Sequence, residues 1–166
     1  MIIRDRITGR TFVPKNIQPG DKIVTYIAGV TFNNHQTLIR DLNENSDIYL
    51  IREPQNVYDP NAIRVVVRTN DEFSFEEIMK LSKDCIDENC IANIGYIPKD
   101  LASKIASIFN IYSFYNAHEY VEMTNKQFLE KENIYSLTIS FRLHNKDLFL
   151  LDAKIYEELK NPRLYY

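Results

Sequence analysis

Six segments of the chain combine β-branched and aromatic residues in the pattern expected of short strands. They are residues 22–32, 47–53, 62–68, 91–97, 118–123 and 134–143. Residues 62–68 are almost continuously apolar in the middle, which is typical of a strand buried on both faces. Gly29 interrupts the first segment, and it predicts a bulge, a sharp bend or the close approach of another backbone.

Helical spacing of apolar residues marks two or three further segments. Residues 99–109 follow Pro98, and proline is favoured in the first turn of a helix. Their apolar stripe consists of Leu101, Ala102, Ile105, Ile108 and Phe109. Residues 75–85 show a weaker helical pattern, whereas residues 147–160 favour a helix in which 148–151 fit a strand equally well.

This order of elements predicts a β-rich α+β fold, in which a small curled sheet or barrel carries two or three packed helices. The chain has 166 residues, 45% of them hydrophobic, which suffices for the core of one domain. No repeat, low-complexity tract or linker divides it, so we expect a single domain over residues 1–166.

The charge of the chain is unevenly distributed. The formal net charge is −3, but residues 71–90 contain seven acidic residues against two lysines, so that this segment carries −5 and the rest of the chain +2. We therefore expect residues 70–90 to form a peripheral, partly helical insertion that keeps acidic charge away from a modestly basic face.

Several classes of site and location are disfavoured. No apolar run approaches the length that crosses a bilayer, and the N-terminus is charged from its fourth residue, so we expect a soluble, cytoplasmic protein without a membrane partner. Cys85 and Cys90 have no further ligands at zinc-site spacing, because His35, His118 and His144 are scattered along the chain. Neither a metal nor a cofactor is expected.

Three motifs resemble the HIRAN domain family, which occurs at the start of certain DNA-repair helicase-like ATPases. They read AGVTF at 28–32, LIREPQNVYDPNAIRV at 50–65 and IGYIPKDLA at 94–102. The second motif is long and orders charged, aromatic and turn residues specifically. The resemblance defines a core over about residues 22–143, with residues 144–166 as a C-terminal extension.

The resemblance implies an OB-like β-barrel of about six strands that captures the 3′-hydroxyl end of single-stranded DNA. By position, Tyr58 would stack on a terminal base and Asp59 would accept a hydrogen bond from the terminal hydroxyl. Tyr26 would contact a base, and Lys99 would contact a phosphate at the start of a helix. Stacking faces accept any base, and a helix N-terminus with a lysine suits an anion.

Two positions depart from the family pattern. Thr25 stands where DNA-end-binding members tend to have a basic residue, which removes one phosphate contact. Tyr96 stands where they have a histidine, although its ring could still stack on a base. For the last aromatic residue of the family's pocket, Phe128 and Tyr135 are the two candidates.

Arg52 and Asn61, both in the longest motif, are additional candidate contacts to DNA. Ordinary structural roles remain open for several of these residues. Asp59 could cap backbone N–H groups of a turn, Arg52 could form a local ion pair with Glu53, and Tyr26 could be a core tyrosine.

The sequence thus favours a binding module over an enzyme. Its expected ligand is single-stranded DNA or a DNA 3′ end, with a DNA-processing protein as a further candidate partner. The main alternative is a protein-interaction module or DNA mimic on the same barrel. A metal-dependent nuclease is less favoured, because Glu53 and Asp59 are too few carboxylates for one or two catalytic ions.

Overall fold

In the computed structural model of the chain, the described residues form two β-sheets and two helices. The description covers residues 2–4, 11–18, 20–53, 56–69, 91–109 and 121–143. The larger sheet has the strand order β2-β1-β3-β8-β7. Its strands are β1 (Ile2–Arg4), β2 (Thr11–Phe12), β3 (Lys22–Tyr26), β7 (Val121–Leu129) and β8 (Ile134–Arg142).

The smaller sheet is antiparallel and has the order β4-β5-β6. Its strands are β4 (Ile48–Arg52), β5 (Ile63–Arg68) and β6 (Ile91–Tyr96), and the helices are α1 (His35–Asp41) and α4 (Lys99–Phe109). Five of the six residues of β5 are buried, as its continuous apolar run predicts for a central strand. Neither α1 nor α4 has the length and apolar content needed to span a bilayer.

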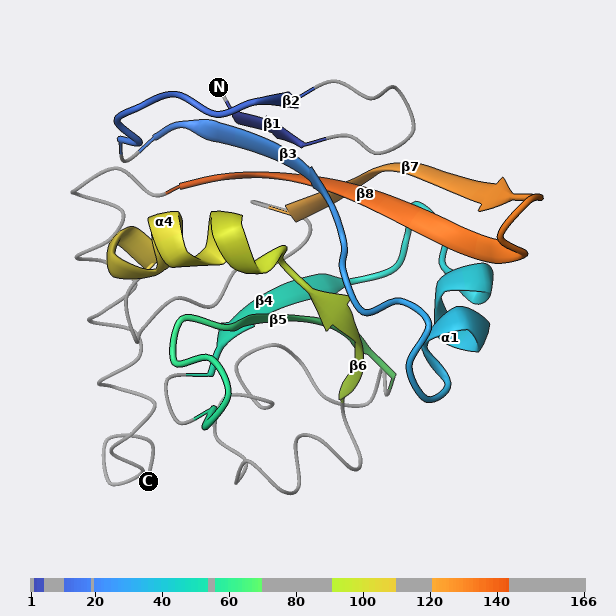
Figure 1. Cartoon of the computed structure of the whole chain (residues 1–166). Helices are drawn as coiled ribbons and strands as arrows, with labels where there is room; N and C mark the ends of the chain where they lie inside the picture. Colours follow the sequence, from blue (N-terminus) through green and yellow to red (C-terminus); the bar gives the residue numbers. More distant parts are fainter. Residues whose placement is uncertain are drawn as a thin grey trace, which may run out of the picture.

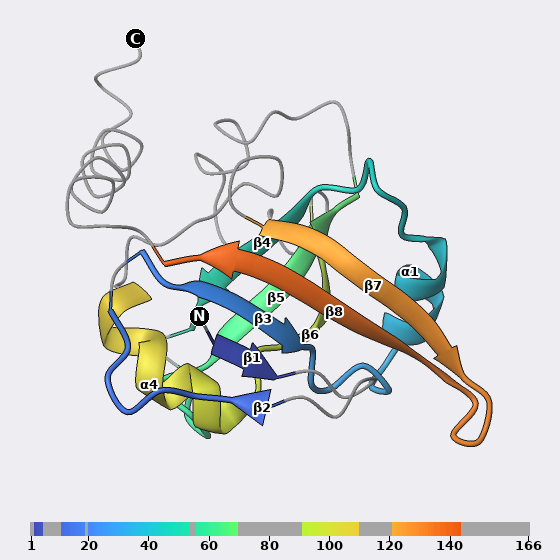
Figure 2. The ribbon, with the colours of Figure 1, turned by 90° about the horizontal axis from the view of Figure 1, so that it is seen from above.

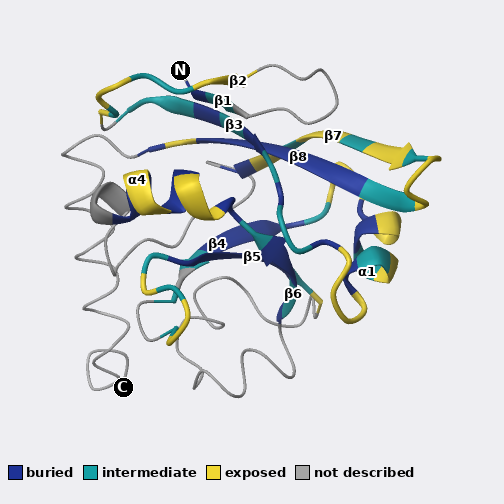
Figure 3. Ribbon diagram, in the orientation of Figure 1, coloured by how far each residue is buried: buried dark blue, intermediate teal, exposed yellow. Residues whose placement is uncertain are grey.

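The two sheets lie one above the other, with a helix at each end of the space between them (Figures 1 and 2). Helix α4 covers one end and helix α1 the opposite end. Buried residues are concentrated on strands that border this space, such as β5 and β8, whereas much of β7 is exposed (Figure 3). Buried residues from both sheets and from α4, among them Leu50, Val65, Leu101, Ile105 and Ile139, form one hydrophobic cluster there. The fold therefore consists of two β-sheets packed around one hydrophobic cluster, with a helix at each end of the space between them.

Among the described residues the sheets do not close into the barrel that the resemblance implies. In the described part of the chain, a single β-bridge between Ala28 and Tyr96 joins them, and no ladder is seen between β4 and β7. The chain leaves the extended conformation at Gly29, whose φ of 72° creates the bend that the sequence predicts. The pairing between the segment after β3 and the end of β6 is therefore limited to the Ala28–Tyr96 bridge. The β-rich α+β class is confirmed, with eight described strands in two sheets instead of about six in one barrel.

The Ala28–Tyr96 bridge depends on a glycine. Gly95 has a φ of 155°, and a Cβ built on it would lie 2.5 Å from the carbonyl oxygen of Ala28 and would also collide with Ile27. The two backbones can approach only because this side chain is missing. The bridge fixes the end of β6, and therefore the start of α4, against the segment that follows β3.

Most of the predicted elements that fall within the described residues are present in the structure. Strands expected at 47–53, 62–68, 91–97 and 134–143 and the helix at 99–109 are present. The strand expected at 22–32 ends at Tyr26, and β7 continues to Leu129, well beyond the end expected at residue 123. The expected helices at 75–85 and 147–160, the acidic insertion at 70–90 and the extension at 144–166 lie outside the described residues.

Candidate nucleic-acid interface

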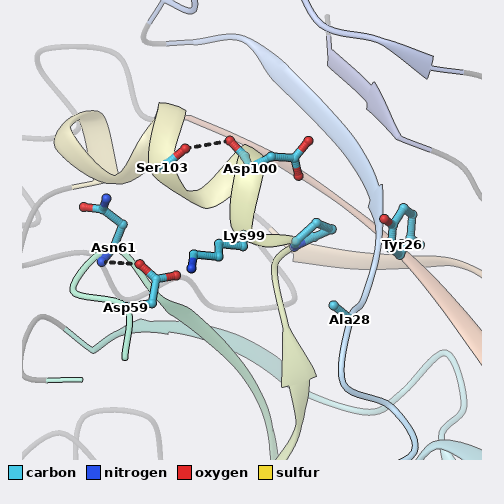
Figure 4. Close-up of a pocket in the computed structure, with 8 residues that line it drawn as sticks. Tyr26, Ala28, Asp59, Asn61, Lys99, Asp100 and Ser103 are labelled. Atoms are coloured by element: carbon cyan, nitrogen blue, oxygen red, sulfur yellow. Dashed lines mark hydrogen bonds between the residues drawn. The ribbon is translucent and has the colours of Figure 1, made fainter. Parts of the chain in front are cut away.

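An open pocket of about 620 Å³ lies where three segments of the chain meet (Figure 4). The segments are the end of β3, the loop at residues 56–61 and the first turns of α4. The pocket is lined by Tyr26, Ala28, Asp59, Asn61, Pro98, Lys99, Asp100 and Ser103. Tyr26, Asp59 and Lys99 were expected at the site, and Asn61 was expected as an additional contact. These four residues are therefore brought together from distant parts of the sequence.

The loop at 56–61 is shaped by side chains that bond to its own backbone. Asn56 Oδ1 accepts hydrogen bonds from the backbone N–H groups of Tyr58 at 2.9 Å and Asp59 at 3.1 Å. Asp59 Oδ1 in turn accepts the N–H of Asn61 at 3.0 Å. Asp59 therefore caps a backbone N–H group of its turn, as the sequence suggested, and it also lines the pocket. Figure 4 shows its other carboxylate oxygen on the side of Lys99.

Glu53 anchors this loop to the smaller sheet. Its Oε1 accepts a hydrogen bond from Asn56 Nδ2 at 3.4 Å, and its Oε2 lies 3.9 Å from Arg64 Nε of β5. The backbone of Glu53 also bonds to Asn56 and Ala62 at 3.0 Å each. Because Glu53 and Arg64 are largely buried, their attraction is screened less by water than that of an exposed pair. Glu53 thus has Arg64 as an ion-pair partner, and the pair with Arg52 that the sequence suggested stays a prediction, because the Arg52 side chain lies outside the described residues.

Tyr96 lies beside the pocket and is not among the residues that line it. Its backbone N–H donates to the Ala28 carbonyl at 2.9 Å, and the Ala28 N–H donates back at 2.8 Å. Burial raises the pKa of its phenol, and the negative charge of Glu53 and a hydrogen bond to that carboxylate raise it further. The phenol is therefore neutral at physiological pH and donates its proton toward Glu53. Its ring, and not its hydroxyl, is the part that remains for contact with a base.

Tyr26 ends β3 on the less buried face of that strand. Ile23 and Thr25 alternate with it and point into the core, whereas Tyr26 is half-buried and its ring reaches the pocket. The Thr25 hydroxyl donates to the carbonyl oxygen of Tyr26 at 2.9 Å. Thr25, the departure from the family pattern noted in the sequence, is thus fully buried and offers nothing to a phosphate.

The first turns of α4 form the third wall. Lys99 is exposed, and Figure 4 shows its ammonium group extending toward the side of the pocket where Asp59 and Asn61 lie. The Ala102 N–H donates to the Pro98 carbonyl at 2.8 Å, so Pro98 accepts the first hydrogen bond of α4 from the position immediately before the helix, one residue earlier than the first helical position that was predicted. Asp100 is also in this turn, and its carboxylate limits how much anionic charge the wall can accept.

Three other candidates, Tyr58, Phe128 and Tyr135, are not among the residues that line the pocket. Tyr58 is 90% exposed at the tip of its loop, next to Asp59. Phe128 and Tyr135 face each other on the β7–β8 hairpin, with ring centroids 5.0 Å apart, and neither lines the pocket. Arg52 pairs with Ile63 through its backbone, and its side chain lies outside the description.

Sequence reasoning missed four lining residues: Ala28, Pro98, Asp100 and Ser103. A helical wheel begun at Lys99 would have placed Asp100 and Ser103 on nearby faces of the first turns. Ser103 Oγ donates to the Asp100 carbonyl at 2.8 Å, so its hydroxyl proton is used within the helix and its oxygen can still accept a hydrogen bond. In the part of the chain that the structure describes, no group of three or more His, Cys, Asp or Glu side chains is arranged to hold a metal ion.

Comparison with known proteins is consistent with these motifs. The HIRAN domain family model matches residues 21–143. A protein described as Fanconi-associated nuclease 1 homolog, from Arabidopsis thaliana, is 28% identical over 93 residues, which are 56% of this chain. The matched region is only 8% of that relative's length. No solved structure matches the chain.

Proposed function

Because the chain belongs to the HIRAN domain family, a family of nucleic-acid-binding modules, we propose that it binds single-stranded DNA and captures a free 3′-hydroxyl end. The observation that carries the proposal is the meeting of Tyr26, Asp59 and Lys99 in one open pocket. An aromatic ring, a hydrogen-bond acceptor and a cation suit the base, the hydroxyl and the phosphate of a terminal nucleotide.

Base contact comes from tyrosine rings. Tyr26 lines the pocket, and Tyr58 presents an exposed ring at its edge. A base stacked on an aromatic side chain contributes about 1–3 kcal/mol, with little preference for sequence. The module therefore recognises single strands, in which the bases are unpaired and available for stacking.

End recognition comes from the opposite charges of Asp59 and Lys99. A carboxylate accepts a hydrogen bond from a terminal hydroxyl and repels a phosphate at the same place. Lys99 and the first N–H groups of α4 attract the phosphate that precedes the terminal sugar. One acidic and one basic group in a single pocket thus favour a chain end over a chain middle.

Fluorescence anisotropy tests the proposal with short single strands that end in a 3′-hydroxyl or a 3′-phosphate and with a circular strand that has no end. We expect tight binding of the 3′-hydroxyl strand alone. Equal binding of all three would reject end capture. Absence of binding at low salt would reject the DNA function and favour the protein-interaction alternative.

Tyr58→Ala should weaken binding of the 3′-hydroxyl strand by about 1–3 kcal/mol, which is the contribution of one stacked base. Val57→Ala is the matched control, because Val57 precedes Tyr58 in the same loop and is 88% exposed. An equal loss in both variants would show that the loop responds to any truncation, and that Tyr58 has no stacking role.

A further inference from the structure

Phe32 is a large apolar side chain in a position where water reaches most of it. It is 65% exposed, in the turn between Gly29 and α1. The turn is fixed by backbone hydrogen bonds, from the Phe32 N–H to the Gly29 carbonyl at 3.5 Å and from the His35 N–H to the Phe32 carbonyl at 3.1 Å. The ring of Phe32 is therefore exposed on a defined turn, in contrast to a side chain on an unstructured loop.

Two side chains of α1 hold this turn in place. Nδ1 of the buried His35 lies 2.8 Å from the Gly29 carbonyl, and it must donate because a carbonyl oxygen only accepts. Gln36 Nε2 donates to the Val30 carbonyl at 2.9 Å and to the Tyr135 carbonyl of β8 at 3.1 Å. The turn is thus tied to the larger sheet, and binding at Phe32 would require little ordering of the chain.

The ring of Phe32 is close to the proposed DNA site. A Cβ placed on Gly29 would lie 3.5 Å from Phe32 Cδ2 and 3.8 Å from Tyr96 Cδ2, so both rings border the same glycine. The preceding residue, Ala28, lines the pocket and forms the bridge to Tyr96. An aromatic surface therefore continues from the pocket past Tyr96 to Phe32.

The charge along this path suits a polyanion. Residues 22–40 contain no Asp or Glu, so the segment from Tyr26 through Phe32 to the start of α1 has no carboxylate of its own. The carboxylate beside Tyr96, that of Glu53, is largely buried and is paired with Arg64. The turn after Phe32 contributes the exposed amides Asn33 and Asn34, which are polar and uncharged. A nucleic-acid strand that leaves the pocket in this direction meets aromatic and amide groups.

We propose that Phe32 is a second stacking position, which binds a base on the 5′ side of the captured end. This inference rests on the proposed function, since the strand must first be held by its 3′ end in the pocket. Its ligand is an unpaired base of the same strand, and its effect is to make affinity increase with strand length beyond the terminal nucleotides.

A length series tests the proposal on the full chain, with 3′-hydroxyl strands from a dinucleotide to a decanucleotide. Phe32→Ala should leave dinucleotide affinity unchanged and weaken decanucleotide binding roughly fivefold or more, the loss of one stacked base. Phe12→Ala is the matched control, because Phe12 is 58% exposed on the edge strand β2, far from the turn (Figure 1). Thermal unfolding of both variants verifies that they are folded.

A second readout reports contact directly. The chain has no tryptophan, so Phe32→Trp introduces a single indole whose fluorescence a stacked base should quench. We expect quenching by the decanucleotide and not by the dinucleotide. Equal affinity of Phe32→Ala and the unaltered protein for every length would reject the second position while end capture stands. Failure of the unaltered protein to bind any 3′-hydroxyl strand would overturn both proposals.

Discussion

Asn56 Oδ1 lies 3.1 Å from the backbone nitrogen of Asp59, so the carboxylate that lines the pocket is presented by a neighbour that does not line it. Asn56 also connects to Glu53, and through Glu53 to Arg64. The geometry of the proposed hydroxyl-reading group therefore depends on a hydrogen-bonded support outside the pocket.

Asn56→Ala should weaken 3′-end binding although Asn56 makes no contact in the pocket, because the Tyr58 and Asp59 N–H groups lose their acceptor. The loss of these bonds should lower the free energy of unfolding by about 1–2 kcal/mol. Asn56→Ser keeps a side-chain acceptor without placing a second carboxylate beside Glu53, and it should recover part of the binding, so anisotropy with all three proteins measures the effect.

Asn43→Ala is the control for this variant. Asn43 Oδ1 accepts the Asn45 N–H at 2.8 Å in an equivalent turn between α1 and β4. Its substitution removes one side-chain bond to a turn, should lower the stability by a smaller amount than Asn56→Ala, and should leave DNA affinity unchanged. A comparable loss of binding in Asn43→Ala would contradict a specific role for Asn56.

Lys99→Ala should reduce the salt dependence of binding. For a single strand, removal of one phosphate contact lowers the slope of log affinity against log salt by about 0.7. Lys104→Ala provides the comparison, because Lys104 is an exposed lysine of the same helix that does not line the pocket. If the two variants change the slope equally, Lys99 contributes only to the general charge of the protein.

Tyr96→Phe should change the alkaline stability of the fold. The folded-state pKa of Tyr96 is raised above the ordinary value of 10.0, so its stabilising contribution is full below pH 10 and disappears as pH rises through the folded-state value. The unaltered protein should be more stable than Tyr96→Phe by roughly 1 kcal/mol at pH 7, and the difference should shrink above pH 10. Urea unfolding at several pH values measures it, and a pH-independent difference would show that the phenol does not titrate this way.

Gly95→Ala should destabilise the fold severely, because the added Cβ meets the Ala28 carbonyl where the two sheets join. We expect a cost of several kcal/mol or failure to fold. Gly20→Ala separates the clash from backbone strain, since Gly20 has a φ of 94° with nothing within 4 Å of its Cβ position. Its cost should be about 1–2 kcal/mol. Similar unfolding temperatures for the two variants would contradict the close crossing of the sheets.

The elements with a clear apolar pattern were predictable from the sequence, whereas short elements and those with few buried residues were not. The central strand β5 and helix α4 were predictable, because β5 carries a nearly continuous apolar run and α4 repeats apolar residues at helical spacing. Strands β1 and β2 have three and two residues, too few to show a period, and β1 is defined by its parallel pairing with the distant β3. Helix α1 was missed because only His35 and Ile39 are buried on it.

The sequence motifs predicted part of the candidate site. Asp59 and Lys99 follow from their places in the motifs, and both line the pocket. The orientation of a side chain depends on its tertiary neighbours, which no local motif contains. The Tyr96 hydroxyl turns to Glu53, and Thr25 points into the core for this reason.

The measurement that tests end capture most directly is the ratio of affinities for 3′-hydroxyl and 3′-phosphate strands, in the unaltered protein and in Asp59→Asn. The amide keeps the acceptor for the Asn61 N–H, removes the negative charge and offers a donor to the pocket. We predict that the unaltered protein favours the hydroxyl end by roughly tenfold or more, and that Asp59→Asn removes most of this preference by binding the phosphate end better. An unchanged ratio in Asp59→Asn would contradict the account.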